Sequence, residues 1–385
     1  MDFHLNSLLN LPKTTVFTCY TEAGFTFIQL NLLNGGIDCP NCQNYTDIIH
    51  QTSHTLIRDL SIFGNGVYLK VPRRKFYCTD CKKYPTEQLV WVEKRQRFTE
   101  RYQEYIYERV KQSSCEQVSR NEDLSAEQIQ RIFSRIAERE LKKKDWGTPE
   151  RLSLDEFSRR KGKGRFATVL IDLDKSSLLE VVDSHKSDDI IAILKQQPES
   201  VRASVKEVCV DMWGGFSKVI KEIFPNAAII IDRFHVMKLV NKSLNRLRLD
   251  LNLKGLIKRY LLLSNNQSLL DEERQDLSEI LNCSPSLSIA YELKEELRQI
   301  YESNLTVKGG TRAIKKWLIS TRIMLGTAAD TIENHLAEIA NYFLNRTTSG
   351  VTEGINTRIK LILRQSYGFK NFTLMREKLL ACLLK

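Results

Sequence analysis

No apolar run in this 385-residue sequence approaches the roughly 18–20 residues that a membrane-spanning helix needs. The longest runs, residues 227–231 and 260–263, are short enough for a protein core. The first residues lack both the basic start and the long apolar stretch of a secretory signal. We therefore expect a cytoplasmic protein that makes no membrane contact. Thiols stay reduced in the cytosol, so the nine cysteines indicate metal binding or burial rather than disulfides.

The composition is that of a folded protein, because hydrophobic residues make up 42% of the chain and charged residues 27%. Its length allows two to four domains, each able to bury a core of its own. The formal net charge of +11 favours a polyanionic partner, and nucleic acid is the first candidate. Many soluble proteins are basic without binding nucleic acid, however, so the charge alone decides little.

Two CxxC pairs lie close together in the N-terminal part of the chain. Their four cysteines are Cys39, Cys42, Cys78 and Cys81. Two such turns at hairpin tips can present four thiolates tetrahedrally to zinc, which gives a closed structural site. The spacing exceeds the common one of about 15–20 residues, so we predict a zinc ribbon with an extended hairpin over residues 38–90. A lead-in at residues 1–37, with one or two strands, would precede it. Four unrelated buried thiols or a redox pair are the alternatives.

Amphipathic stretches follow within residues 91–145. We expect helices at residues 98–111, around 115–120 and at 126–141. Ser125 is suited to cap the last helix, whose polar face carries Arg131 and Arg135. This pattern fits a helix-turn-helix whose last helix enters the major groove of DNA. An ordinary helical bundle with a solvated charged face fits the pattern equally well, and the neighbouring zinc ribbon favours DNA.

From residue 152 onward the pattern changes to short runs rich in β-forming residues. We expect strands at residues 152–157, 166–172, 177–182, 207–210 and 227–231, with helices at 188–195 and 215–223. Such an order of elements predicts a mixed α/β sheet. Residues 241–344 instead read as almost wholly helical. We interpret them as an inserted helical domain, because a loop of that length would be improbable.

Three carboxylates stand at the ends of expected elements, far apart in the sequence. Asp155 ends the first strand, Asp211 follows the strand at 207–210, and Glu353 opens a helix. Phosphoryl transfer on DNA needs a nucleophile formed at neutral pH and a neutralised leaving oxygen, and two Mg²⁺ ions can supply both. Magnesium prefers oxygen ligands such as carboxylates and substrate phosphates, so we expect these acids to gather in one Mg²⁺ (or Mn²⁺) site.

Each acid taken singly fits a cap or a turn at least as well. Asp172 and Asp174 are rivals for the first position, but they lie in an expected hairpin where acids commonly occupy turns. Glu156, next to Asp155, would point to the opposite face of the strand.

Basic and amide side chains flank the three acids. Asn356, Lys360 and Arg364 follow Glu353 on the same helix face, where they could contact DNA phosphates. A basic loop directly after Asp155 carries Arg159, Arg160 and Lys161. Contacts of this kind bind the DNA backbone without reading its sequence. For any single one of these cations, a solvated surface charge is the simpler interpretation.

Several segments together resemble the DDE insertion-sequence transposases of the ISL-three type. They are DEFSRRKGKGRFATVLIDL, VDMWGGF followed by DRFHV, and SGVTEGINTRIKLILRQSYGFKNF. The CPNC and RRKFYCTDC segments resemble the zinc ribbon that opens such proteins, so the resemblance runs from about residue 38 to the end.

The resemblance implies a multidomain α/β protein with a ribonuclease H-like catalytic domain. This domain would comprise residues 146–240 and 345–385, interrupted by the all-α insertion at 241–344. By position, the family triad falls on Asp155, Asp211 and Glu353. Asp232 and His235 resemble the D-x-x-H pair found beside the site in related transposases. A structural hydrogen bond below the strand explains that pair equally well.

The implied activity is DNA transposition. The protein would bind the terminal inverted repeats of its element through the ribbon and the helix-turn-helix, and would cut and join double-stranded DNA with magnesium. A complex that holds two DNA ends needs at least a homodimer. A non-catalytic DNA-binding regulator or a degenerate transposase is the main alternative, and a metal-dependent nuclease that cuts without joining is a second.

Overall fold

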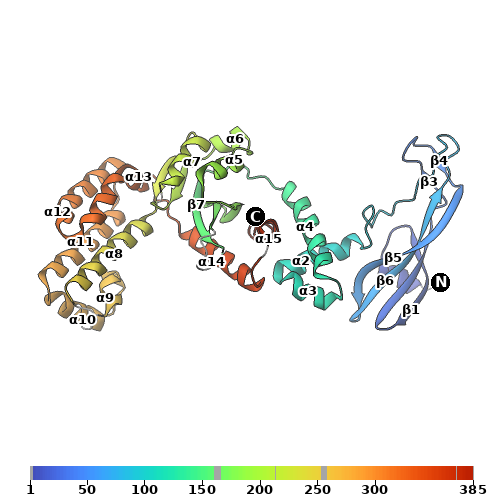
Figure 1. Ribbon diagram of the computed structural model, residues 1–385, viewed down its shortest axis with the longest axis horizontal. Helices are drawn as coiled ribbons and strands as arrows, with labels where there is room; N and C mark the ends of the chain where they lie inside the picture. Colours follow the sequence, from blue (N-terminus) through green and yellow to red (C-terminus); the bar gives the residue numbers. More distant parts are fainter. Residues whose placement is uncertain (1–2, 160–165, 213, 253–257, 370, 385) are drawn as a thin grey trace. The chain divides into compact units, whose positions relative to one another are not determined.

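The computed structural model in Figure 1 describes residues 3–159, 166–212, 214–252, 258–369 and 371–384. The chain divides into two compact units. The first unit comprises Met1–Lys143 and Leu363–Ala381, and the second comprises Lys144–Ile362 and Cys382–Lys385. Within the described ranges, none of the helices is both long enough and apolar enough to cross a membrane.

The first unit begins with a four-stranded sheet in the order β1-β2-β6-β5. Its strands are β1 (Thr14–Glu22), β2 (Phe25–Leu32), β5 (Ile49–Ile62) and β6 (Asn65–Phe76), and helix α1 (Phe3–Leu9) precedes them. β5 and β6 form the extended hairpin that the cysteine spacing predicted, and β2 pairs in parallel with β6. The segment expected as a lead-in therefore supplies two strands to the ribbon's own sheet. The apolar side chains that alternate along these strands, such as Ile28 and Leu69, are buried on one face.

Three helices follow in the first unit: α2 (Glu100–Gln112), α3 (Cys115–Glu122) and α4 (Ala126–Lys142). Ser125 caps α4 as predicted, in a reciprocal capping box with Gln128. The apolar face of α4, which includes Ile129 and Phe133, is fully buried against α2 and α3.

The C-terminal helix α15 (Phe372–Leu383) also belongs largely to the first unit. Its Leu374 packs on the core of the three helices, and Ser134 of α4 donates a hydrogen bond of 2.6 Å to Glu377. The sequence had assigned this helix to the catalytic domain, because nothing in its pattern tells which core its apolar side chains join.

The second unit contains a five-stranded mixed sheet in the order β11-β10-β7-β8-β9. Its strands are β7 (Arg151–Ser158), β8 (Phe166–Asp172), β9 (Ser177–Val182), β10 (Glu207–Val210) and β11 (Ala228–Ile231). β7, β8 and β9 form an antiparallel meander, whereas β10 and β11 run parallel to β7. The helices α5 (Ser187–Leu194), α6 (Glu199–Ala203) and α7 (Gly215–Ile223) connect the later strands. The predicted mixed α/β sheet is thus confirmed.

Between β11 and α14 (Gly350–Gln365), the described residues form helices and no strand (Figure 1). The helices are α8 (Arg233–Asp250), α9 (Arg259–Leu263), α10 (Asp271–Asn282), α11 (Pro285–Glu302), α12 (Val307–Asn334) and α13 (Leu336–Ala340), with 3-10 turns η1 (Asn266–Ser268) and η2 (Asn341–Phe343). The helical stretch begins earlier than residue 241, because α8 starts directly after β11. Fully buried Tyr301 and Trp317 lie at its centre, where the Trp317 indole donates to the Leu293 carbonyl at 2.7 Å.

Two glycines of α12 occupy opposite kinds of environment. A Cβ atom at Gly310 would overlap with the ring of Phe343, whereas one at Gly326 would meet open space. The close approach of α12 to η2 therefore requires a glycine at position 310 but not at position 326.

We expect Gly310→Ala to lower the free energy of unfolding by about 1–3 kcal/mol, the usual result of overpacking a core. Gly326→Ala should instead leave it almost unchanged, because the added Cβ would meet open space next to the kink of α12 at Leu325. Denaturant unfolding of both variants measures the contrast. Equal effects of the two substitutions would contradict the packing described for α12.

Candidate functional site

Four cysteine side chains converge at the open end of the β5–β6 hairpin, where one CxxC pair precedes β5 and the other follows β6. The sulfur atoms of Cys39, Cys42, Cys78 and Cys81 all lie within 4.8 Å of one another. The shortest separations are 3.6 Å between Cys39 and Cys81 and 3.5 Å between Cys42 and Cys78. Four mutually close thiols from two CxxC turns match the donor set of a closed, structural zinc site.

The electrostatics of this cluster also favour a divalent cation. The backbone N–H of Asn41 is the main influence that lowers the pKa of Cys39, to about 6. The backbone N–H of Asn44 acts in the same direction on Cys42, but burial and the neighbouring thiols outweigh it and raise that pKa to about 12. One thiolate thus forms readily, and its charge opposes ionisation of the others until a cation compensates it.

The candidate catalytic acids lie at the carboxyl ends of the parallel strands. Asp211 and Asp232 follow the last residues of β10 and β11, and the backbone N–H of Asp232 donates to the Val210 carbonyl at 3.0 Å. Asp155 does not end its strand as predicted, because β7 continues to Ser158. Pairing of β7 with β10 stops at Ser153, however, so Asp155 lies just beyond the end of the neighbouring strand. The carboxyl edge of parallel strands is where open α/β sheets bind their ligands.

Asp155 is half-buried and closely surrounded. Burial is the main influence that raises the pKa of its carboxyl, and the nearby Asp211 carboxylate adds to it. The Glu156 backbone N–H, the Asn356 side chain and His235 act in the opposite direction. Asp211 and His235 therefore each lie within electrostatic range of Asp155. Two acids that repel each other in a poorly solvated place fit the binding of a cation between them.

Helix α14 is attached to this edge by a hydrogen bond of 2.6 Å from the Asn356 amide to Asp155 Oδ2. Glu353 lies one turn earlier in the first turn of the helix, and its side chain is exposed. Ile355 and Ile359 are buried, as the predicted helix face requires. Within the described residues, the four cysteines are the group of potential metal ligands whose ligand atoms all lie within 4.8 Å of one another. Asp155, Asp211 and Glu353 do not meet this distance as a group.

Asp232 is almost completely buried and accepts a hydrogen bond from the Ser349 hydroxyl. This contact ties the start of α14 to the end of β11. His235 lies in the first turn of α8, and its backbone N–H donates to the Asp232 carbonyl at 3.0 Å. Ser349 was missed at the level of sequence, because a lone serine before a helix is suited to capping and carries no other signal.

Glu156 lies closer to the site than its predicted position implies. Burial first, and then the Asp211 and Asp155 carboxylates, raise the pKa of its carboxyl, while His185 lowers it. Its Oε1 atom is buried and has no hydrogen-bond partner among the described residues. The alternation of side chains along β7 does not reveal that Glu156 lies near Asp211, because Asp211 belongs to the end of another strand.

The rival first acids lie elsewhere. Asp172 pairs with Leu152 at the beginning of β7, and its carboxylate accepts the backbone N–H groups of Asp174 and Lys175 in a turn. Asp174 forms an ion pair with Arg151. Both acids therefore serve the turn at the opposite end of the strand from Asp155.

The predicted DNA-contacting cations differ in their availability. Arg131 is 77% exposed, with one weak ion pair to Glu127, whereas Arg135 is half-buried against Glu93. Arg159 forms an ion pair with Asp183 and is only 12% exposed, so its guanidinium is engaged within the fold. Lys360 and Arg364 are exposed on α14. Arg160 and Lys161 lie outside the described residues.

Three family models match successive parts of this chain. The model for the zinc-finger of the IS204/IS1001/IS1096/IS1165 transposases matches residues 36–81. The helix-turn-helix model of the transposase family ISL3 matches residues 87–137, and the ISL3 transposase model matches residues 152–379.

Two curated relatives show similarity over large parts of the chain. The transposase for insertion sequence element IS1001 of Bordetella parapertussis is 27% identical over 348 residues, which cover 86% of this chain and 85% of that protein. The transposase for insertion sequence element IS1557 of Mycobacterium tuberculosis is 25% identical over 261 residues, which cover 57% of each chain.

The chain thus combines the parts of a transposase. These parts are a thiol cluster in a β domain, a helix-turn-helix, and a mixed sheet with acids at one edge. The transposase model spans more than half of the sequence, and the chain belongs to the ISL3 family of DDE transposases. The resemblance found in the sequence is confirmed, and the cysteine cluster together with the zinc-ribbon match supports structural zinc.

We expect Cys42→Ser to release zinc and to unfold the two CxxC segments at the open end of the hairpin, because the site would lose one of four thiolate ligands. Zinc content and circular dichroism measure the two effects, and zinc should also be lost as the pH falls, because protons compete for the thiolates. Cys19→Ser is the matched control, since Cys19 is exposed and lies outside the cluster. Retention of a full equivalent of zinc by Cys42→Ser would contradict the site.

Proposed function

We propose that this chain is the transposase of an insertion sequence, which binds the terminal inverted repeats of its element and cuts and joins DNA strands with two divalent metal ions. The observation that carries the proposal is the position of Asp155 and Asp211 at the carboxyl edge of one mixed sheet. Helix α14, with Glu353 in its first turn, is attached to the same edge through Asn356.

The strand order supports a ribonuclease H-like catalytic domain. An antiparallel meander of three strands is followed by two strands parallel to the first, and the first strand stands in the centre. In this order, β7 and β10 are neighbours, so their acids meet at one edge. The helices α8 to α13 lie between the second acid and the third in the sequence, as an insertion into such a domain would.

Asp155, Asp211 and Glu353 would hold the metal ions. When bound, Mg²⁺ or Mn²⁺ would supply an activated water or 3′-hydroxyl and would neutralise the leaving oxygen. Asn356 orients the Asp155 carboxylate, because its amide donates to one of the two oxygens. Ser349 holds Asp232, which fixes the entry into α14 next to the strand ends. His235 supplies a polar group within range of Asp155 that could order the site or contact DNA.

The helix-turn-helix would recognise the ends of the element, and the exposed cations of α14 would contact the phosphate backbone. Two ends held in one complex need at least two copies of the chain.

We expect Asp211→Asn to reduce strand cleavage by more than about 100-fold, which exceeds the usual loss when only an outer partner of a metal ligand is removed. Binding to the element ends should stay unchanged, because the helix-turn-helix is untouched. DNA that flanks the gene and includes both ends, incubated with protein and Mg²⁺, measures cleavage, and gel shift measures binding. Asp271→Asn is the control, since Asp271 is 98% exposed on α10.

Two outcomes would contradict this assignment. Equal cutting by wild type and Asp211→Asn would mean that the metal site lies on other residues. Binding of the ends without cleavage by the wild type, with Mg²⁺ or Mn²⁺, would favour a regulatory DNA-binding protein.

We expect Arg131→Ala to weaken binding to the element ends and to lower the salt dependence of binding by about one ionic contact. Arg135→Ala should act mainly on stability, because its guanidinium pairs with Glu93. Titrations at several salt concentrations, together with thermal unfolding, separate the two roles. An unchanged salt slope for Arg131→Ala would exclude a phosphate contact at this residue.

A further inference from the structure

A pocket of about 400 Å³ opens beside the third candidate acid. Its walls come from the first turns of α8, the loop before η1, α11 and the start of α14, and they include Asp232, Phe234 and Glu353. The volume lies in the usual range of small-ligand sites, roughly 300–1,000 Å³. Because Glu353 and Asp232 belong to both, the pocket adjoins the proposed catalytic edge.

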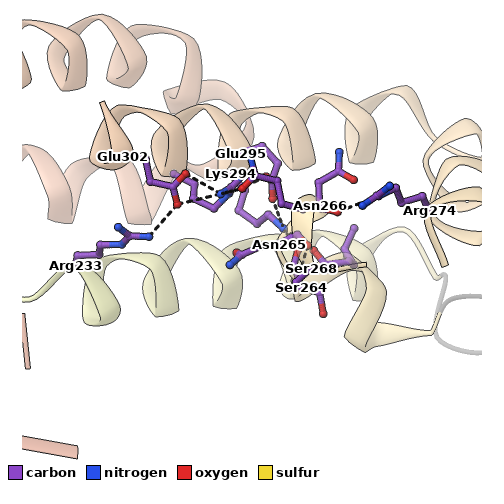
Figure 2. Close-up of polar contacts among 12 residues, drawn as sticks. Arg233, Ser264, Asn265, Asn266, Ser268, Arg274, Lys294, Glu295 and Glu302 are labelled. Carbon is purple, nitrogen blue, oxygen red and sulfur yellow. Dashed lines mark hydrogen bonds and ion pairs between the residues drawn. The ribbon is translucent and has the colours of Figure 1, made fainter. Parts of the chain in front are cut away.

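The cations of this pocket are already engaged. Arg298 lines the pocket, and its guanidinium contacts Glu302 at 2.9 Å and Glu295 at 2.9 Å. Figure 2 shows Arg233 of α8 directed towards Glu302 of α11, with a separation of 3.3 Å. The pocket wall therefore carries two paired arginines against the two acids Asp232 and Glu353. Such a lining has no excess positive charge with which to attract a phosphate.

The remaining lining groups suit a flat, neutral ligand with hydrogen-bonding edges. Phe234 lines the pocket and is 50% exposed, so part of its side chain is available to a stacking partner. Asn241 also lines the pocket, and its Oδ1 atom is buried with no hydrogen-bond partner among the described residues. Asn265, from the loop before η1, adds a second amide (Figure 2). Amide groups both donate and accept, as the edge of a nucleobase does.

Contacts of Lys294 hold the wall formed by α11 and the loop before η1 in place. Lys294 of α11 bonds the carbonyl groups of Leu262 and Ser264 at 3.2 and 2.6 Å, and contacts Glu295 at 3.0 Å. The loop that carries Asn265 is thereby attached to α11 (Figure 2). A recognition pocket needs walls that are positioned before the ligand arrives, and these contacts supply them.

We propose that this pocket receives one extruded nucleobase of the DNA strand bound along the catalytic edge, with Phe234 as its stacking partner and Asn241 as a partner for its polar edge. The inference rests on the proposed function, because the strand must pass Glu353 to reach the pocket. Extrusion of one base next to the cut would open the duplex and fix the position of the strand on the enzyme. Enzymes that extrude a base hold it by stacking and by its exposed edge in this manner.

The test asks whether the effect of the Phe234 ring on cleavage depends on one particular base of the DNA. Cleavage rates are measured for wild type and Phe234→Ala on duplexes that carry one element end, either intact or with one abasic site at each position around the cut in turn. On intact DNA, Phe234→Ala should cut about fivefold to a hundredfold more slowly, the range expected for loss of one base–aromatic stack. At one abasic position the two proteins should cut at equal rates, because the base that Phe234 holds is missing there.

Two further variants exclude a general effect of substitution. Phe234→Tyr keeps the ring and should cut intact DNA faster than Phe234→Ala does. Ile323→Ala removes another exposed apolar side chain, on α12 and outside the pocket lining, and should also leave the rate unchanged. Phe234→Ala should unfold at the wild-type temperature, because the side chain is half-exposed.

The outcomes separate the pocket from the proposed function. Equal rates of wild type and Phe234→Ala on intact DNA, or a defect of the same size at every abasic position, would overturn the base pocket while wild-type cleavage still supports the transposase. Absence of any wild-type cleavage would overturn both.

Discussion

The hydrogen bond from Asn356 to Asp155 is the contact on which the arrangement of the site depends. It joins α14 to the central strand β7 across 201 positions of sequence. Ser349 makes a second attachment to Asp232 at the end of β11, and Thr347 a third to the buried Glu207 of β10. Because Glu353 precedes Asn356 by one turn of α14, these attachments hold the start of α14, with Glu353, beside Asp155 and Asp232.

Both proposed metal sites concentrate groups of one charge in places with little water. Burial raises the pKa of Asp155 and of Glu156, and neighbouring carboxylates add to the effect. In the ribbon, one thiol pKa falls to about 6 while that of a neighbour rises to about 12. Like charges held this close are destabilising on their own, and a divalent cation turns the same arrangement into a favourable one. The pocket beside Glu353 differs from the two metal sites. The arginines at its wall are paired with glutamates, so charges of opposite sign lie next to each other there.

Much of the fold followed from local pattern. Ser125 as a cap, the buried face of α4, the strands of the mixed sheet and the isoleucines of α14 all follow from periodicity and capping chemistry, which act within a few residues. The failures involve partners distant in sequence. Asp155 was expected at a strand end, but β8 extends β7 to Ser158. Arg159 pairs with Asp183, a partner that the linear pattern did not reveal. Residues 1–37 were expected as a lead-in with one or two strands before the ribbon, but β2 pairs with β6.

The sequence by itself determined the family, the four clustered cysteines and most of the order of helices and strands, and it was the source of the proposal for the three acids. These depend on residue type and spacing, which a linear pattern preserves. Only the tertiary structure decided which ends of strands meet, which arginines are already paired, that Glu156 lies near the acids, and that α15 joins the core of the first unit. The reason is physical, because burial and electrostatic interaction depend on distance in space, and residues such as Asn356 and Asp155 come together only through the fold.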